Sequence, residues 1–196
     1  MYPGKLIAYV GPMYSGKSHH MAGHFLPMQL AHNLQFALFQ PQKNLRDGAK
    51  LSSRTGIALP AQQISSLLDI PIGVYGYIGI DELHLFGAKD IAHLQTLRQA
   101  GAEVIVSLLD LDYRAQLMPA FKAVLELGPD QVVHLRAVCS KCHSYNTATY
   151  TQILNQSGEV ILAGLQSEKS EEHTSTLIYE ARCATCFNQS KHALKF

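Results

Sequence analysis

The sequence lacks a long apolar run, a strong charge of either sign and a large number of cysteines. No apolar stretch approaches the roughly 20 residues of a membrane-spanning helix, and residues 1–5 have no signal-peptide character, because only a strand-length apolar run follows them. The 16 Lys and Arg residues nearly balance the 15 Asp and Glu residues, which argues against a chain whose main task is to grip nucleic acid. We therefore expect a cytoplasmic protein with no membrane and no nucleic-acid partner, whose four cysteines stay reduced.

The composition and patterning indicate an α/β fold. A chain of 196 residues favours one domain with at most a small appendage, and 47% hydrophobic residues suffice for a buried core. Apolar runs alternate with helix-like segments, which predicts a parallel sheet with helices on both faces. The expected strands are Leu6–Val10, Gln35–Phe39, Val74–Ile80 and Glu103–Leu109. The expected helices are near Ser18–Asn33, Ala61–Leu68 and Ala88–Ala100, and the polar residues 40–59 are expected to form a loop.

A phosphate-binding motif follows the first expected strand. Residues 11–18 fit G-x-x-x-x-G-K-[ST] at every fixed position, between an expected strand and an expected helix. The glycines let backbone N–H groups converge on phosphate oxygens, Lys17 reaches the β- and γ-phosphates, and Ser18 offers a hydroxyl to Mg²⁺. An ordinary glycine-rich turn is the alternative, and the strand–helix context argues against it. We expect a P-loop NTPase-like fold that binds ATP with Mg²⁺ through Gly11, Pro12, Met13, Tyr14, Ser15, Gly16, Lys17 and Ser18.

Two carboxylates end a later apolar run. Asp81 and Glu82 follow Tyr77–Ile80, and a neighbouring strand would place Asp81 beside Ser18. Magnesium prefers oxygen ligands and usually takes one carboxylate in such a site, and a second carboxylate can act as general base. The alternative is that both residues only cap the following helix; the P-loop upstream favours the phosphate site.

All four cysteines lie in the last 60 or so residues. Cys139 with Cys142, and Cys183 with Cys186, form two C-x-x-C pairs. Together they can close a four-sulfur Zn²⁺ site, which is structural because no position remains for water. A redox dithiol is the alternative, but neither pair follows a thioredoxin-like strand. We expect an ATP-binding domain at 1–135 and a small zinc-ribbon-like lobe at 136–196, which serves as a nucleic-acid module, a partner surface or a lid; the low net charge favours the last two.

At this point the chain resembles the thymidine kinases shared by bacteria, animals and poxviruses, over nearly its whole length. The Gly-Pro-Met-[Phe/Tyr]-Ser-Gly-Lys pattern is more restricted than the general P-loop pattern. Together with Tyr-x-x-x-Cys-x-x-Cys it is specific for this family. The segments that carry the resemblance are 11–18, 80–82, 104–110, 112–114, 137–142, 148–152 and 179–186.

The resemblance implies ATP-dependent phosphorylation of the 5′-hydroxyl of deoxythymidine to thymidine monophosphate. Glu82 would be the general base, and Asp81 and Ser18 would hold Mg²⁺. Lys17 and Arg46 would neutralise charge on the transferring phosphoryl group. The zinc lobe would carry a lasso loop that covers the thymine base. The family is usually tetrameric and inhibited by thymidine triphosphate, so a homotetramer is expected.

The resemblance also implies a nucleoside pocket. Tyr179 matches the base-stacking tyrosine, and backbone groups near 161–164 would hydrogen-bond the thymine edge. The implied pocket residues are Met13, Leu85, Leu109, Tyr113, Thr151, Ile161, Leu162, Ala163, Gly164 and Tyr179.

The chain departs from the family in places. A family amide is His84, a pocket aromatic is Leu85, and a lysine and an aspartate before the loop arginine are Gln40 and Asn44. These changes spare the residues assigned to phosphoryl transfer and bear on substrate choice.

Three other functions remain open. One is a kinase for another pyrimidine deoxynucleoside, and the second is a non-catalytic nucleotide sensor, against which Glu82 argues. The third, an ATPase acting on nucleic acid, lacks a basic stripe and exposed stacking aromatics.

Overall fold

The computed structural model describes residues 3–31, 34–43, 49–52, 56–161 and 177–192. The chain divides into two compact units, each assembled from segments that are apart in the sequence. The first unit comprises Met1–Val10, Lys17–Leu108 and Pro119–His134. The second unit comprises Gly11–Gly16, Leu109–Met118 and Leu135–Phe196.

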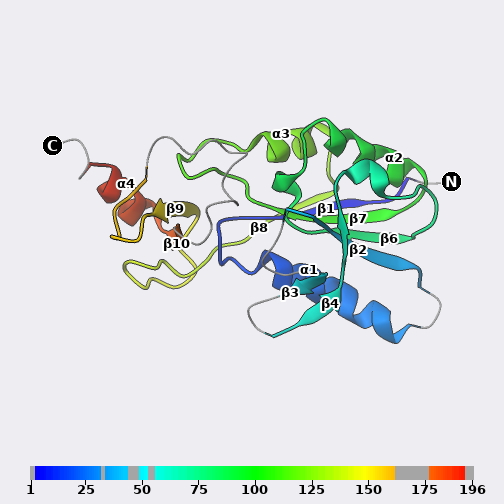
Figure 1. Ribbon diagram of the computed structural model, residues 1–196, viewed down its shortest axis with the longest axis horizontal. Helices are drawn as coiled ribbons and strands as arrows, with labels where there is room; N and C mark the ends of the chain where they lie inside the picture. Colours follow the sequence, from blue (N-terminus) through cyan, green and yellow to red (C-terminus); the bar gives the residue numbers. More distant parts are fainter. Residues whose placement is uncertain (1–2, 32–33, 44–48, 53–55, 162–176, 193–196) are drawn as a thin grey trace. The chain divides into compact units, whose positions relative to one another are not determined.

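A six-stranded parallel sheet forms the first unit, in the order β5-β2-β6-β7-β1-β8. Its strands are β1 (Leu6–Val10), β2 (Phe36–Pro41), β5 (Gln62–Ile64), β6 (Tyr77–Ile80), β7 (Glu103–Leu108) and β8 (Gln131–His134). Its α-helices are α1 (Lys17–Phe25), α2 (His93–Gln99) and α3 (Pro119–Glu126). Helix α1 covers one face, and α2 and α3 cover the other (Figure 1). The predicted α/β class with a parallel sheet is confirmed.

The sheet register sets the carboxyl ends of three strands side by side. Val10 of β1 pairs with Leu108 of β7, and Ile80 of β6 pairs with Val106 of β7. In open parallel sheets this edge is where ligands bind. The segments that leave β1 and β6 here are the P-loop and the Asp81–Glu82 pair.

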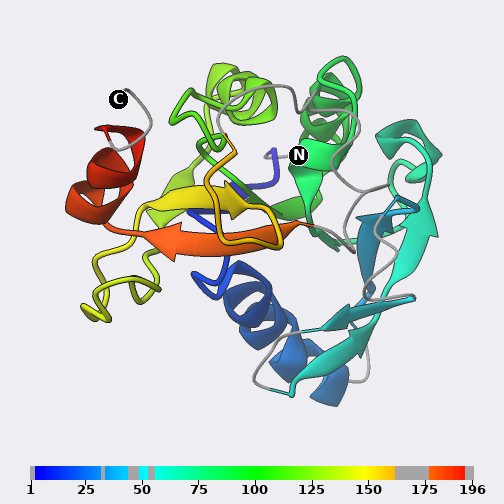
Figure 2. The ribbon, with the colours of Figure 1, turned by 60° about the vertical axis from the view of Figure 1, so that its left-hand side comes forward.

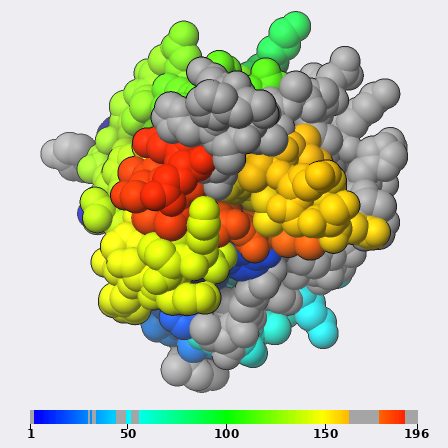
Figure 3. Space-filling model, turned by 90° about the vertical axis from the view of Figure 1, so that its left-hand side faces the viewer, coloured from blue at the N-terminus to red at the C-terminus, as the bar shows by residue number. Residues whose placement is uncertain are grey.

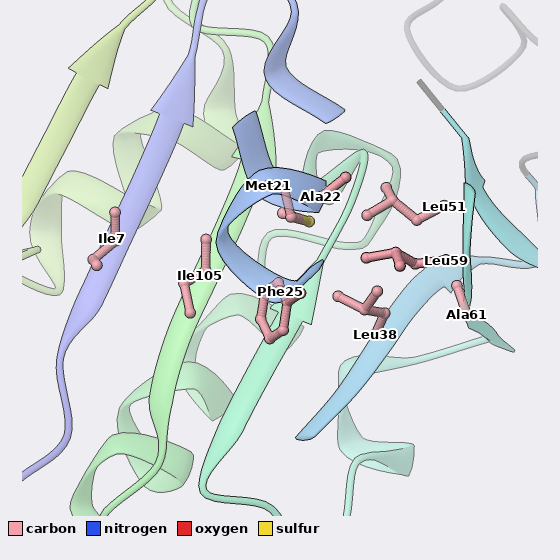
Figure 4. Packing of buried hydrophobic residues seen from close by; sticks show 9 residues of the cluster. All are labelled: Ile7, Met21, Ala22, Phe25, Leu38, Leu51, Leu59, Ala61 and Ile105. Atoms are coloured by element: carbon pink, nitrogen blue, oxygen red, sulfur yellow. The ribbon is translucent and has the colours of Figure 1, made fainter. Parts of the chain in front are cut away.

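The core beneath α1 joins the helix to the sheet and to a small hairpin. The hairpin consists of β3 (Lys50–Ser52) and β4 (Ala58–Pro60). Figure 4 shows Phe25 of α1 between β7 and the hairpin side chains. The cluster contains Ile7, Met21, Ala22, Phe25, Leu38, Leu51, Leu59, Ala61 and Ile105. Gly79 leaves room for this packing, since a Cβ there would come within 2.7 Å of Phe25 Cε2. This burial fixes α1 on the sheet and so fixes the first residues of α1.

Three sequence expectations about single elements are wrong or incomplete. The predicted helix at 61–68 is wrong, because residues 62–64 form strand β5 parallel to β2; pairing with the sheet overrides a weak local signal. The helix expected to reach residue 33 ends at Phe25, since Pro27 follows and the chain continues as a 3₁₀ turn. The expected loop at 40–59 contains β3 and β4, while residues 44–48 and 53–55 lie outside the described residues.

The second unit is built on an antiparallel pair, β9 (Tyr150–Leu154) and β10 (Ile178–Arg182), followed by α4 (Ala184–His192). Figure 2 shows β10 alongside β9 with α4 continuing from its end. The Tyr150 ring stacks on Phe187 of α4, with centroids 4.5 Å apart and planes 12° apart. Among the described residues of both units, no helix is long and apolar enough to cross a membrane.

Candidate active site

The tip of the P-loop is a tight, self-bonded turn in the second unit. Gly11 has φ +146°, and a Cβ there would lie 2.4 Å from the Leu135 carbonyl oxygen. Gly16 has φ +84°, a conformation that other residues rarely adopt. Ser15 Oγ donates to the Pro12 carbonyl over 2.9 Å. Both motif glycines are therefore required by the backbone of this loop.

Strand β9 meets the same loop. The Met13 N–H donates to Thr151 Oγ1 over 3.0 Å. Two residues expected at the nucleoside pocket are thereby brought together, 138 positions apart in the sequence. Tyr179 pairs with Ile153 across the hairpin, and the Ile161 N–H donates to the Ile153 carbonyl. Thr151, Ile161 and Tyr179 thus belong to one small sheet-like assembly.

The other expected pocket residues belong to other segments of the chain. Leu109 and Tyr113 lie in the Leu109–Met118 segment of the second unit, and the hydroxyl of Tyr113 accepts hydrogen bonds from the Arg114 guanidinium. Leu85 lies in the first unit, in a 3₁₀ turn after β6. Arg46 and the pocket residues Leu162, Ala163 and Gly164 lie outside the described residues.

The first residues of α1 meet the end of β6 in the first unit. Ser18 Oγ donates to Asp81 Oδ2 over 3.0 Å, as expected from the strand order. Ser107 of β7 donates from Oγ to Asp81 Oδ1. Lys17 is only 6% exposed and Asp81 2% exposed. A buried lysine and a buried carboxylate are thus held where β1, β6 and β7 end.

Glu82 has an unusual backbone. Its φ of +50° and ψ of +42° lie in the left-handed region, which carries strain for a residue with a Cβ. Its N–H donates to Ser107 Oγ over 3.4 Å. Its carboxylate Oε2 lies 3.6 Å from His84 Nδ1, and both side chains are nearly buried. The Glu82 carboxylate thus has His84 as its neighbour, whereas the Asp81 carboxylate contacts Ser18 and Ser107.

Burial shapes the protonation of two groups here. Burial raises the pKa of Asp81 to about 6, the charge of Glu82 adds to the rise, and the hydroxyls of Ser107 and Ser18 oppose it. Burial also lowers the pKa of His84 to about 3, and the charge of Lys17 acts in the same direction. At neutral pH the site therefore holds an ionised Asp81 and a neutral imidazole at His84.

The four cysteines converge in the second unit. Their sulfur atoms all lie within 4.8 Å of one another, and Cys142 Sγ is 3.8 Å from Cys183 Sγ. All four lie within the described residues, and none forms a disulfide. Figure 3 shows the segment before β9, in yellow, beside α4, in red. Tetrahedral Zn–S bonds of about 2.3 Å place the sulfurs about 3.8 Å apart, so the cluster can hold one metal ion.

Sequence reasoning missed two contributors to the site. Ser107 interrupts the buried apolar run that begins at Val104 in β7, and this interruption is the signal that could have identified it. His84 was noted only as a departure from a family amide, and its position beside Glu82 depends on the left-handed turn, which no sequence pattern predicts.

Comparisons with known proteins extend beyond these motifs. The chain matches the family model described as thymidine kinase over residues 4–187. It is 31% identical over 195 residues to a thymidine kinase of Chloroflexus aurantiacus, covering 94% of each chain. It is 29% identical over 201 residues to a thymidine kinase of Roseiflexus sp., covering 96% of this chain and 97% of the relative. A thymidine kinase of Mesomycoplasma hyopneumoniae is 28% identical over 190 residues, covering 94% and 96%. The likeness therefore runs nearly from end to end.

Proposed function

Because this chain belongs to the thymidine kinase family, we propose that it transfers the γ-phosphoryl group of ATP to the 5′-hydroxyl of deoxythymidine. The observation that carries the proposal is the Ser18–Asp81 contact, formed beside the buried Lys17 and followed directly by Glu82. Phosphoryl transfer depends mainly on positioning and on neutralising charge. A preassembled set of one cation, one hydroxyl and two carboxylates meets that need.

The donor side of the site comprises the P-loop and the start of α1. The backbone N–H groups of residues 11–16 would hold the phosphates, and Lys17 would bind the transferring oxygen atoms. Ser18 and Asp81 would hold Mg²⁺, which would supply positive charge to the phosphates. The hard oxygen atoms of a hydroxyl and a carboxylate suit this ion. We assign Arg46 the same neutralising role from the family resemblance.

Glu82 would act as general base. Its carboxylate would take the proton of the 5′-hydroxyl as the oxygen bonds to the γ-phosphorus and the bond to ADP breaks. The separate contacts of the two carboxylates support this role, because Asp81 is bonded to Ser18 and Ser107 while Glu82 lies near His84. One carboxylate would thus serve the metal and the other the proton.

The nucleoside side of the site is assigned by resemblance. Tyr179 would stack on thymine, and the backbone near 161–164 would bond its polar edge. The remaining residues proposed to line the pocket are Met13, Leu85, Leu109, Tyr113 and Thr151. The Met13–Thr151 hydrogen bond supports a connection between the P-loop and strand β9.

The cysteine cluster is proposed to bind structural Zn²⁺. The donor set of four sulfurs and their spacing fit a closed tetrahedral site, which leaves no position for water. The ion would tie the segment before β9 to the start of α4 and so support β10, which carries Tyr179. The residues 136–196 would then act as the substrate-covering lobe.

We also propose a homotetramer, which light scattering would test.

A nucleoside panel tests the function. Purified protein is incubated with labelled ATP, Mg²⁺ and thymidine, deoxyuridine, deoxycytidine or deoxyguanosine. We expect thymidine to give the highest kcat/KM and labelled thymidine monophosphate as product. A higher kcat/KM for another pyrimidine deoxynucleoside would make that nucleoside the substrate in place of thymidine. ATP binding with no phosphorylated nucleoside would favour a nucleotide sensor.

A further inference from the structure

Ser107 contacts both members of the Asp81–Glu82 pair through a single hydroxyl. Its Oγ donates to Asp81 Oδ1, and the Glu82 N–H donates to the same Oγ over 3.4 Å. A serine hydroxyl has one donor and two acceptor positions, so both contacts form together. The side chain is fully buried, which keeps solvent from competing for either contact.

The sheet holds Ser107 rigidly in this place. Ser107 pairs with Tyr9 of β1 on one side, and the preceding Val106 pairs with Ile80 of β6 on the other. Because β6 and β7 are parallel, Ser107 lies level with Asp81, the residue after Ile80. A site built on a strand keeps its geometry better than one built on a loop.

Glu82 needs such support. A residue with a Cβ in the left-handed region is strained, and such a conformation persists only where its surroundings hold it. Asp81 has a second partner in Ser18, whereas Ser107 bonds the backbone of Glu82 itself. The strained turn and the buried hydroxyl therefore form one arrangement.

We propose that Ser107 is a positioning residue for phosphoryl transfer, which fixes the general base relative to the magnesium ligand by bonding the Glu82 backbone and the Asp81 carboxylate at once. This inference rests on the proposed function. Without the hydroxyl, the Asp81 carboxylate loses one of its two hydroxyl partners and the Glu82 peptide loses its partner in β7. The base and the metal ligand then move independently.

Three substitutions separate the hydroxyl from the volume it occupies. Ser107→Ala removes the hydroxyl, Ser107→Cys keeps its size with a weak hydrogen-bonding group, and Ser107→Thr keeps the hydroxyl. We expect kcat to fall about 10–100-fold in the first two, the usual cost of losing a supporting partner. Thymidine KM should stay close to the wild-type value, and the Mg²⁺ concentration for half-maximal rate should rise. Ser107→Thr should recover most of the lost rate.

The control is Ile105→Val, which trims a buried side chain of the same strand and leaves the hydroxyl in place. It should lower thermal stability slightly and leave kcat unchanged. Wild-type kcat in both Ser107→Ala and Ser107→Cys would overturn the proposal. An equal loss of kcat in Ile105→Val would also overturn it, because the effect would then be one of packing.

A binding readout keeps this inference separate from the proposed function. Calorimetric titration of Mg²⁺ into protein with bound ATP requires no acceptor nucleoside. We expect weaker Mg²⁺ binding in Ser107→Ala than in wild type, and equal affinities would overturn the positioning role. If wild type forms no thymidine monophosphate, the proposed function fails, while this titration still decides the role of Ser107.

Discussion

Three residues proposed for phosphoryl transfer, Lys17, Asp81 and Ser107, lie in a different structural setting from Met13 and Tyr179, which are proposed to contact the nucleoside. In the first unit, Lys17, Asp81 and Ser107 are all less than 9% exposed, and the last two are bonded to each other. In the second unit, Met13 and Tyr179 are only partly buried. Asp81 and Ser107 lie at the ends of paired parallel strands and Lys17 begins helix α1, whereas Met13 lies in a loop and Tyr179 on a two-stranded hairpin.

Under the proposed function, this difference would separate reaction chemistry from substrate choice. Buried groups in a sheet register cannot shift without disturbing the core, so the charge arrangement proposed for phosphoryl transfer is held in place. Partly buried side chains on short loops can change with little cost to the fold. The departures at His84 and Leu85 lie in the first unit, in the 3₁₀ turn after Glu82, and they leave Lys17 and Asp81 intact.

Lys17 offers the largest test of the comparison. Lys17→Ala should lower kcat by about 10²–10³-fold or more, because it removes a fixed positive charge from the developing transition state. The control Lys5→Ala removes an exposed lysine at the opposite end of β1 and should retain full rate. Steady-state kinetics at saturating ATP and thymidine measure both. Lys17→Ala with near wild-type kcat would mean that the preassembled site is not the donor site.

The cysteine cluster tests whether the second unit needs a metal. Metal analysis should find about one Zn²⁺ per chain. Cys142→Ser should lose this ion and lower the midpoint of thermal unfolding by about 5 °C or more. Ser140→Ala, which lies between Cys139 and Cys142, should keep the ion and the wild-type midpoint. A metal-free, fully folded wild type with reactive thiols would contradict the zinc assignment.

Arg98 tests stability apart from activity. Its guanidinium bonds Asp130 at 2.9 Å and the carbonyls of Gly4 and Leu127, and it is 9% exposed. Arg98→Ala removes these contacts, while Asp130, which is half exposed, keeps the Leu6 N–H, so the free energy of unfolding should fall by about 2–3 kcal/mol, mainly from the lost bonds to the carbonyls. Arg98→Lys keeps the positive charge but loses the several N–H donors of the guanidinium. It should lower the free energy of unfolding by less than Arg98→Ala does. Urea denaturation measures the loss, and kcat at 25 °C should not change. A parallel loss of kcat would show that the distant core and the site are coupled.

His84 gives the smallest predicted effect. Its pKa is depressed in the fold to about 3 by burial, so its contribution to stability is present above the unfolded pKa near 6.5 and is lost as pH falls toward 3. Between pH 7 and pH 5 this loss amounts to about 2 kcal/mol. His84→Gln should remove it and flatten the acid side of the stability curve. Parallel curves for the two proteins in urea unfolding from pH 7 to 5 would contradict this account.

Much of the first unit could be predicted from sequence, because apolar runs report buried strands directly. Strand β1 was predicted at its observed bounds, and the Ser18–Asp81 contact follows from the strand order. The family, too, was predicted correctly from the particular residues of its motifs. Strand β5 was missed because three residues are too few to show a hydrophobic periodicity, and only pairing with β2 makes them a strand.

The details of the site were harder to predict. The left-handed turn at Glu82 and the role of Ser107 depend on contacts between β6 and β7 that are absent from any local pattern. The nucleoside residues came from resemblance alone, and their assignment stays a prediction. Short loops have no periodicity from which their side-chain directions could be read.

The most direct test of the central claim is phosphoryl transfer by Glu82→Gln compared with wild type under single-turnover conditions. Labelled ATP, Mg²⁺ and thymidine are mixed with excess protein, and labelled thymidine monophosphate is followed with time. We predict rapid formation by wild type, and in Glu82→Gln normal ATP binding with transfer slowed about 10²–10⁴-fold, the usual contribution of a general base. Transfer at the wild-type rate in Glu82→Gln, or no transfer in wild type, would contradict the account.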